Sequence, residues 1–197
     1  MKIFNLDKTE NALELMRQEV SVLKDLKNRH IVNYVTHSES AVWIKKDGSR
    51  VKVAYIVEEA VLGGELFDYI YDQEAMSEPI CRYFFKQILI ALSYLHGKGF
   101  THRDLKLENI LLEENFDVKI IDFGFSKEMD GVLTSTMGTA TYMAPEMLKN
   151  NPEYNGTDID LFAAAVILFI LISKCPPFTD EASAKDPFYS LIVQNKN

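Results

Sequence analysis

The sequence predicts an α+β fold in which a small antiparallel sheet with one helix precedes a mainly helical part. Two apolar runs, residues 31–44 and 50–57, are typical of strands, and the Asp47-Gly48 pair between them indicates a hairpin turn. Just before these strands, apolar residues recur at helical spacing over residues 11–26. From about residue 64 onward helical patterns dominate, with one helix starting at Ser77-Glu78-Pro79 and another over residues 161–172.

Length and composition limit the classes of protein that this chain can be. With 197 residues, 47% of them hydrophobic, the chain can bury a substantial core. Its net charge of −8 argues against a nucleic-acid or anionic-membrane surface and is compatible with a basic peptide as partner. The longest apolar run, residues 161–172, is too short to cross a bilayer. We therefore expect no nucleic-acid partner and no membrane span.

The two cysteines indicate a reducing environment. Cys81 and Cys175 lie far apart and match no metal-ligand spacing. Each neighbours apolar or proline residues, so we expect both to be buried free thiols. This predicts an intracellular, cytoplasmic protein.

Two charged residues near the N-terminus need an explanation. Lys2 lies at the tail of a strand-like run, and Glu19 lies inside the apolar stripe of the helix at residues 11–26. A carboxylate on a buried face costs free energy unless it is paired. The alternatives are an ordinary solvated lysine at Lys2 and a Glu19 side chain that reaches water at the edge of the helix face.

The chain is organised around residues 102–124. Asp104, Lys106 and Asn109 share one loop, at a spacing that lets a carboxylate, an ammonium and an amide converge. Asp122 follows a strand-like run, and a hairpin at residues 115–117 would return it to the side of Asn109. A carboxylate beside an amide oxygen suits Mg²⁺, and a second carboxylate can accept a proton from a hydroxyl. Phosphoryl transfer needs this combination.

Three motifs in this region resemble those of eukaryotic protein kinases. They are His102-Arg103-Asp104-Leu105-Lys106-Leu107-Glu108-Asn109, Asp122-Phe123-Gly124 and Ala144-Pro145-Glu146. The resemblance implies the bilobal protein-kinase-like fold, with a partial N-lobe and hinge over residues 1–62 and a partial C-lobe over residues 63–197. Lys106 together with Thr139 resembles the Ser/Thr branch. The Gly63-Gly64-Glu65 hinge exit resembles calcium/calmodulin-dependent-kinase-like members.

The resemblance also implies roles in ATP-dependent phosphorylation of protein Ser/Thr. Asp104 orients the substrate hydroxyl and accepts its proton, and Lys106 neutralises the transferring phosphate. Asn109 and Asp122 hold Mg²⁺ and contact ATP. The aspartate that bonds back to the catalytic loop is best matched by Asp160, although Asp158 and Asp160 are also both candidate caps for the helix that follows.

Binding of ATP is implied for residues in the first third of the chain. In the family a helix glutamate pairs with the strand lysine that aligns the phosphates, here Glu19 with Lys2. Backbone groups of Glu59 and Val61 would bond the adenine. Glu58 falls at the back of the adenine pocket, where the family usually has an apolar residue or Thr, and this departure puts the shape and polarity of the pocket in question.

Two further sets of residues match functional positions of the family. Glu65 and Glu108 match residues that contact arginines upstream of the phosphorylated site, although both are equally consistent with solvated surface acids. Arg103 and Lys127 would receive a phosphate on the mobile segment 125–146, with Ser135 as the predicted site and Thr136 as a neighbouring substitute. The alternative is a Ser/Thr-rich loop of no regulatory use.

The chain contains no glycine-rich loop, and the resemblance predicts a domain that is incomplete at both ends, about three quarters of the family's length. We expect a chain of this extent to be nearly inactive by itself. The alternatives are a pseudokinase or interaction module, favoured by the missing loop, and a small-molecule phosphotransferase of related fold. The Ala144-Pro145-Glu146 segment favours protein substrates over small molecules.

Overall fold

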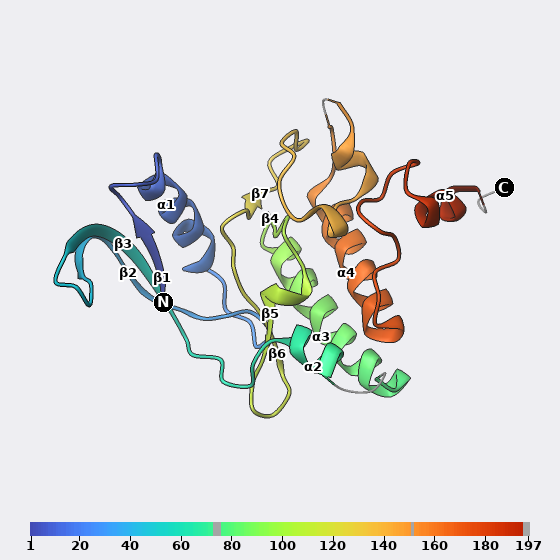
Figure 1. Ribbon diagram of the computed structural model, residues 1–197, viewed down its shortest axis with the longest axis horizontal. Helices are drawn as coiled ribbons and strands as arrows, with labels where there is room; N and C mark the ends of the chain where they lie inside the picture. The colour runs from blue at the N-terminus through green and yellow to red at the C-terminus, as the bar shows by residue number, and fades with distance from the viewer. Residues whose placement is uncertain (73–75, 151, 195–197) are drawn as a thin grey trace.

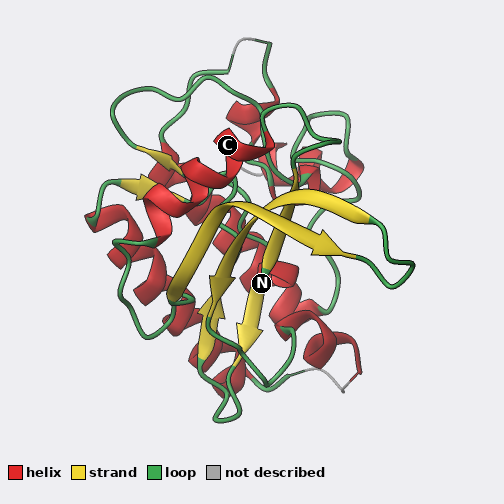
Figure 2. Ribbon diagram, turned by 90° about the vertical axis from the view of Figure 1, so that its left-hand side faces the viewer, coloured by secondary structure: helices red, strands yellow, loops and turns green. Residues whose placement is uncertain are grey.

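The computed structural model describes residues 1–72, 76–150 and 152–194. A sheet with one helix lies at one side of the molecule, and the remaining helices lie at the other (Figure 1). The sheet has the order β1-β3-β2, with β1 (Lys2–Asn5), β2 (Tyr34–Ile44) and β3 (Arg50–Glu58) all antiparallel. The predicted α+β fold is therefore correct, and Figure 2 shows the three strands in front of the helices.

The sheet and its helix form where the sequence predicts them, with shorter bounds. Trp43 pairs with Val51 across the hairpin that contains Asp47-Gly48, and Gly48 has the positive φ of 80° that such a turn requires. Strand β2 begins at Tyr34 and not at residue 31. Helix α1 (Ala12–Leu23) ends three residues earlier than expected, and its apolar stripe is buried with Glu19 inside it.

The second part is built on two long helices that pack together, α3 (Glu78–Gly97) and α4 (Gly156–Ser173). The shorter α2 (Leu66–Asp72) and α5 (Pro187–Gln194) lie beside them (Figure 1). Ser77 is the N-cap of α3 with extended backbone and a proline in the first turn, but its side chain makes no capping hydrogen bond.

The start of α4 differs from the prediction. The helix begins at Gly156, and its N-cap is Asn155, whose side chain accepts a hydrogen bond from the Thr157 amide. Asp158 and Asp160 both lie inside the helix, so neither caps it. This earlier start makes α4 18 residues long and apolar enough, by length and composition, to cross a membrane, yet 50% of it is buried inside the fold, as in the core helix of a globular domain.

Short strands connect the helices and carry the loops between them. A hairpin pairs β5 (Ile110–Leu112) with β6 (Val118–Ile120), and β4 (Phe100–Thr101) pairs with β7 (Lys127–Glu128). At the open end of the first hairpin, the Ile121 amide donates to the Asn109 carbonyl at 3.0 Å. As predicted, this hairpin returns the chain from Asn109 to the residue before Asp122.

One continuous apolar core joins both parts. It includes Met16 and Ile56 from the sheet side and Leu107 and Phe123 from the loops, all at most 1% exposed. Cys81 is buried in this core as expected, and it is a free thiol. The prediction for Cys175 is wrong: this thiol is also free but exposed, because the chain turns outward at the left-handed Lys174 that ends α4.

Candidate active site

Asp160 of α4 holds the loop between β4 and β5 in place through two hydrogen bonds to its backbone. Its Oδ2 accepts a 2.9 Å hydrogen bond from the His102 amide, and its Oδ1 accepts one of 2.9 Å from the Arg103 amide. Arg103 has a positive φ of 66°, a strained conformation that these bonds help to maintain. The bond back to the loop predicted for Asp160 is therefore confirmed.

Asp160 has a further partner that the sequence did not indicate. His96, at the end of α3, lies with Nε2 2.9 Å from Asp160 Oδ2. Burial alone would raise the pKa of Asp160, but the hydrogen bonds from His96 and the loop amides outweigh burial and lower it. Asp160 is 1% exposed and is the buried anionic anchor of the loop.

Asp104, Lys106 and Thr139 form a closed triangle of polar groups. Lys106 Nζ lies 3.1 Å from Asp104 Oδ2, and it donates to Thr139 Oγ1 at 3.0 Å. Thr139 Oγ1 in turn donates to Asp104 Oδ1 at 2.9 Å. Gly138 allows this approach, because a Cβ there would lie 2.6 Å from the Arg103 carbonyl oxygen. The predicted convergence of carboxylate and ammonium is thus present, with Thr139 as the link.

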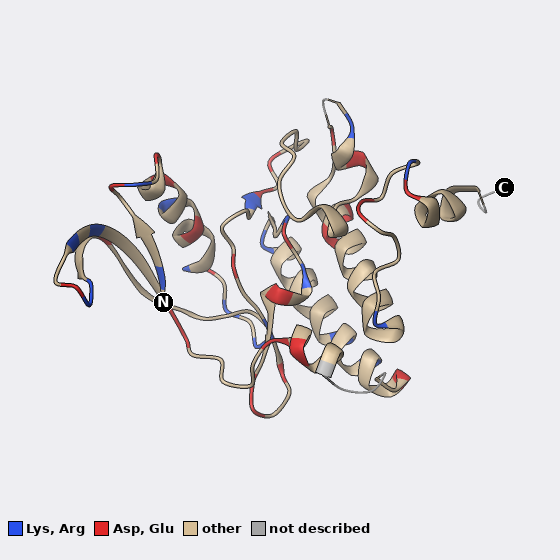
Figure 3. Cartoon of the chain, in the orientation of Figure 1, with Lys and Arg blue, Asp and Glu red and all other residues tan. Residues whose placement is uncertain are grey.

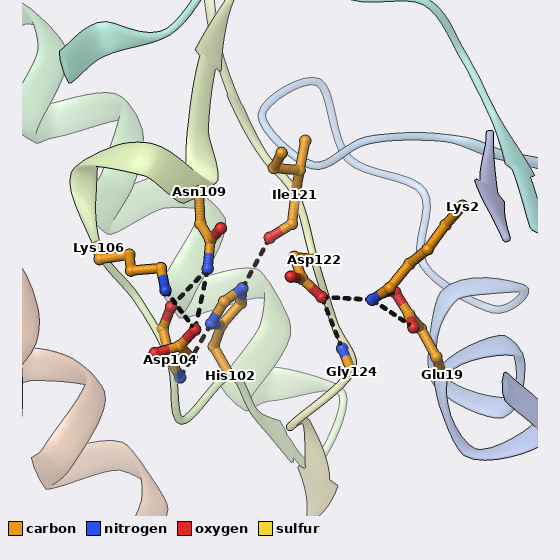
Figure 4. Close-up of polar contacts among 9 residues, drawn as sticks. All are labelled: Lys2, Glu19, His102, Asp104, Lys106, Asn109, Ile121, Asp122 and Gly124. Carbon is orange, nitrogen blue, oxygen red and sulfur yellow. Dashed lines mark hydrogen bonds and ion pairs between the residues drawn. The ribbon is translucent and has the colours of Figure 1, made fainter. Parts of the chain in front are cut away.

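Asn109 and Asp122 offer the oxygen atoms that a divalent cation prefers. Asn109 Nδ2 donates to the Asp104 carbonyl oxygen at 2.9 Å, which orients its amide oxygen away from the loop. Asp122 has a positive φ of 61°, which is strained for a non-glycine residue and fixes its carboxylate between the two parts of the molecule (Figure 4). An amide and a carboxylate oxygen fit Mg²⁺.

Lys2 faces this carboxylate from the sheet. Its Nζ lies 2.8 Å from Glu19 Oε2 and 2.7 Å from Asp122 Oδ1 (Figure 4). The ion pair predicted between Lys2 and Glu19 is therefore present. Burial acts to lower the pKa of Lys2, but the two carboxylates outweigh it and the pKa lies above its usual value. The bond from Lys2 likewise holds the pKa of Asp122 below its usual range against the effect of burial.

The segment after β3 is tied down by the side chain of Glu59. This carboxylate accepts hydrogen bonds from Lys119 Nζ at 2.5 Å and from the Asn33 amide at 2.9 Å. The Glu59 amide donates to the Asn33 carbonyl at 3.0 Å, so the carbonyl of Glu59 is the backbone group left for a ligand. Val61 follows on the same segment. No sequence pattern indicated the buried Lys119 as the partner.

The predicted regulatory residues fall into two places. Arg103 Nη1 donates to Ser135 Oγ at 2.9 Å, and Lys127 lines the same surface hollow of about 440 Å³ as Arg103 and Ser135. Thr136 points elsewhere and donates to the Met147 carbonyl at 3.1 Å. The structure thus brings Ser135, and not Thr136, to the arginine.

The predicted substrate-binding acids, Glu65 and Glu108, are both exposed. Glu65 precedes α2, and Glu108 lies in the short helix η1 (Leu107–Asn109), within the loop that carries Asp104 and Asn109. Their exposure leaves the choice between substrate contact and solvated surface acid open.

Fold and site together define a class of protein. A lysine–glutamate pair on the sheet side faces a metal-suited aspartate, and a carboxylate–ammonium pair lies on the loop beyond it (Figure 4). This is the constellation of a phosphotransferase of the protein-kinase type. The protein kinase domain family matches residues 1–195, and the chain belongs to that family.

Similar proteins support the serine/threonine branch. The chain is 36% identical over 189 residues to CBL-interacting serine/threonine-protein kinase 5 of Arabidopsis thaliana, covering 92% of this chain and 40% of that protein. It is 37% identical over 182 residues to the NUAK family SNF1-like kinase 1 of Mus musculus, covering 90% of this chain and 26% of that protein. The chain thus spans less than half the length of these relatives. These relatives are consistent with the resemblance to calcium/calmodulin-dependent-kinase-like members.

Proposed function

We propose that this protein phosphorylates serine and threonine residues of protein substrates, with ATP as phosphate donor and Mg²⁺ as the required metal. The observation that carries the proposal is the triangle of Asp104, Lys106 and Thr139, facing Asp122 and the Lys2–Glu19 pair. This arrangement supplies a proton acceptor, a cation for the transferring phosphate and a metal ligand at one site.

The roles follow from charge and hydrogen bonding. Asp104 accepts the proton of the substrate hydroxyl, and Thr139 and Lys106 keep its carboxylate oriented. Lys106 also neutralises charge on the phosphate during transfer. Asn109 and Asp122 would hold Mg²⁺, which would supply positive charge beside the phosphate oxygens. Since Asp104 is 6% exposed, these charges act in a site from which much of the water is excluded.

Nucleotide binding is proposed for the sheet side of this site. Lys2, aligned by Glu19, holds phosphate oxygens. The carbonyl of Glu59 and the amide of Val61 hold the adenine, and the bonds from Asn33 and Lys119 to Glu59 keep this segment in position. Glu65 and Glu108 are proposed to contact basic residues of the substrate.

Two further proposals concern regulation and location. Phosphate on Ser135 would take up charge-assisted bonds from Arg103, which already contacts its hydroxyl, and from Lys127 in the same hollow. A cytoplasmic location is supported by the two free thiols, because the exposed Cys175 would be open to oxidation in an oxidising compartment.

The proposal is tested with the longest chain that the gene encodes. Labelled ATP is offered with pools of serine, threonine and tyrosine peptides, in Mg²⁺ and in a chelator, and the products are analysed for phosphoamino acids. We expect phosphoserine and phosphothreonine that depend on Mg²⁺. Nucleotide binding without transfer would indicate the alternative, a pseudokinase or interaction module, and phosphotyrosine alone would contradict the serine/threonine assignment.

A further inference from the structure

Glu58 is the last residue of β3, and its side chain is partly buried. Neighbouring residues of a strand point to opposite faces, and the adjacent Glu59 carboxylate points away, to Lys119 and Asn33. Burial raises the pKa of Glu58, and Lys2 and Asp122 are near enough for their charges to act on its carboxyl group. Acidic residues lie at both ends of the connection from β3 to α2 (Figure 3).

One oxygen of this carboxyl group has no partner. Glu58 Oε1 is buried, and no group in the described part of the chain forms a hydrogen bond with it. Its cationic neighbour Lys2 donates instead to Glu19 Oε1, Glu19 Oε2 and Asp122 Oδ1, and an ammonium has three hydrogens to donate. A buried acceptor without a donor costs free energy, which a ligand with a suitable donor would recover.

We propose that Glu58 is a specificity-determining residue that selects nucleotides whose purine carries an amine, and not a carbonyl oxygen, at C6. The inference rests on the proposed ATP site, in which the base bonds the carbonyl of the adjacent Glu59. An ionised carboxylate accepts hydrogen bonds but cannot donate one. An amine at the base edge would therefore satisfy Oε1, whereas a carbonyl oxygen there would be repelled and would leave Oε1 unpaired.

The test compares ATP with inosine triphosphate, which replaces the exocyclic amine by a carbonyl oxygen. Dissociation constants are measured calorimetrically at pH 8 with Mg²⁺, for the wild type and Glu58→Gln. The amide of Glu58→Gln can rotate to donate or to accept, so we expect the preference for ATP to fall about tenfold or more. Because both nucleotides carry the same triphosphate, any effect of the lost charge on phosphate or metal cancels in the ratio.

Two comparisons keep the result decisive. Glu114→Gln makes the same change at an exposed acid in the turn between β5 and β6 and should leave the ratio unchanged. Glu58→Met removes the unpaired acceptor, so the free protein should unfold at a temperature higher by about 2 °C or more. A lower unfolding temperature would mean that the carboxylate has a partner in the free protein, and would overturn the proposal.

The binding outcomes separate this inference from the proposed function. If the wild type binds neither nucleotide, the ATP site itself is wrong, and this inference is overturned with it. If the wild type binds both nucleotides alike, or if Glu58→Gln keeps the full preference for ATP, the ATP site stands and the role of Glu58 is overturned.

Discussion

Lys2 Nζ lies 2.7 Å from Asp122 Oδ1, a contact that joins the sheet to the loop after β6. The same ammonium pairs with Glu19, whose side chain is only 1% exposed. One cation thus compensates a buried carboxylate on α1 and orients the proposed metal ligand. This link connects α1 to the proposed phosphate site.

The first prediction concerns this coupling. Lys2→Met should lower the free energy of unfolding by about 1–3 kcal/mol, because it leaves the Glu19 carboxylate buried and unpaired. The expected loss is smaller than for a fully buried pair, because the Lys2 side chain is 36% exposed and solvent screens its charge. Adding Glu19→Gln removes the unpaired charge, so the double variant should be more stable than the sum of the two single effects predicts. Urea unfolding of the four proteins measures this, and strictly additive effects would show that the pair is not coupled.

The second prediction concerns Asp160. Asp160→Asn places an amide group against the backbone donors of His102 and Arg103. It should therefore lower the free energy of unfolding by about 2–4 kcal/mol at pH 7. The pKa of Asp160 is lower in the folded chain than its usual value of about 3.9, so its contribution is present above that pH and is lost as the pH falls through the folded pKa. The stability difference between wild type and variant should therefore shrink below about pH 4. A difference that stays constant down to pH 2 would contradict the assignment.

A third prediction concerns the segment 125–146. Phosphate on Ser135 should slow proteolysis of this segment about tenfold or more, because charge-assisted bonds to Arg103 would order it. Phosphate on Thr136, whose hydroxyl bonds Met147 instead, should have little effect. Limited proteolysis of singly phosphorylated proteins measures both rates, and equal protection by the two phosphates would remove the special role of Ser135.

The fourth prediction concerns substrate charge. Glu108→Arg should raise KM about tenfold for peptides with arginines upstream of the target residue and less than about twofold for neutral peptides, because it replaces attraction by repulsion. Glu114→Arg is the matched control, since it makes the same charge change at another exposed acid. An equal loss on both sets of peptides would mean that Glu108 is only a surface acid.

Much of the site was predictable because its signals are local in the sequence. Asp104, Lys106 and Asn109 lie within one loop, and a short hairpin is enough to return Asp122 to them. The position of Glu19 on the apolar stripe of α1 indicated that it needs a partner, and the family resemblance implied Lys2.

What the sequence did not reveal depends on contacts between distant residues. Glu59 and Lys119 are 60 residues apart, and His96 and Asp160 are 64 apart, with no periodicity linking either pair. The left-handed backbone of Arg103 and Asp122 is also invisible in the sequence, because both are non-glycine residues held there by surrounding bonds. The cap of α4 was missed although Asn155-Gly156 offered a signal, since Asp158 and Asp160 competed with it.

The central claim is that Asp104 serves phosphoryl transfer and not nucleotide binding. Its most direct test is the turnover of a serine peptide by the longest chain the gene encodes, beside the dissociation constant for ATP with Mg²⁺, in the wild type and in Asp104→Asn. We predict that turnover falls by about 10²–10⁴ while the dissociation constant changes less than about threefold. Undiminished turnover in Asp104→Asn would contradict the claim.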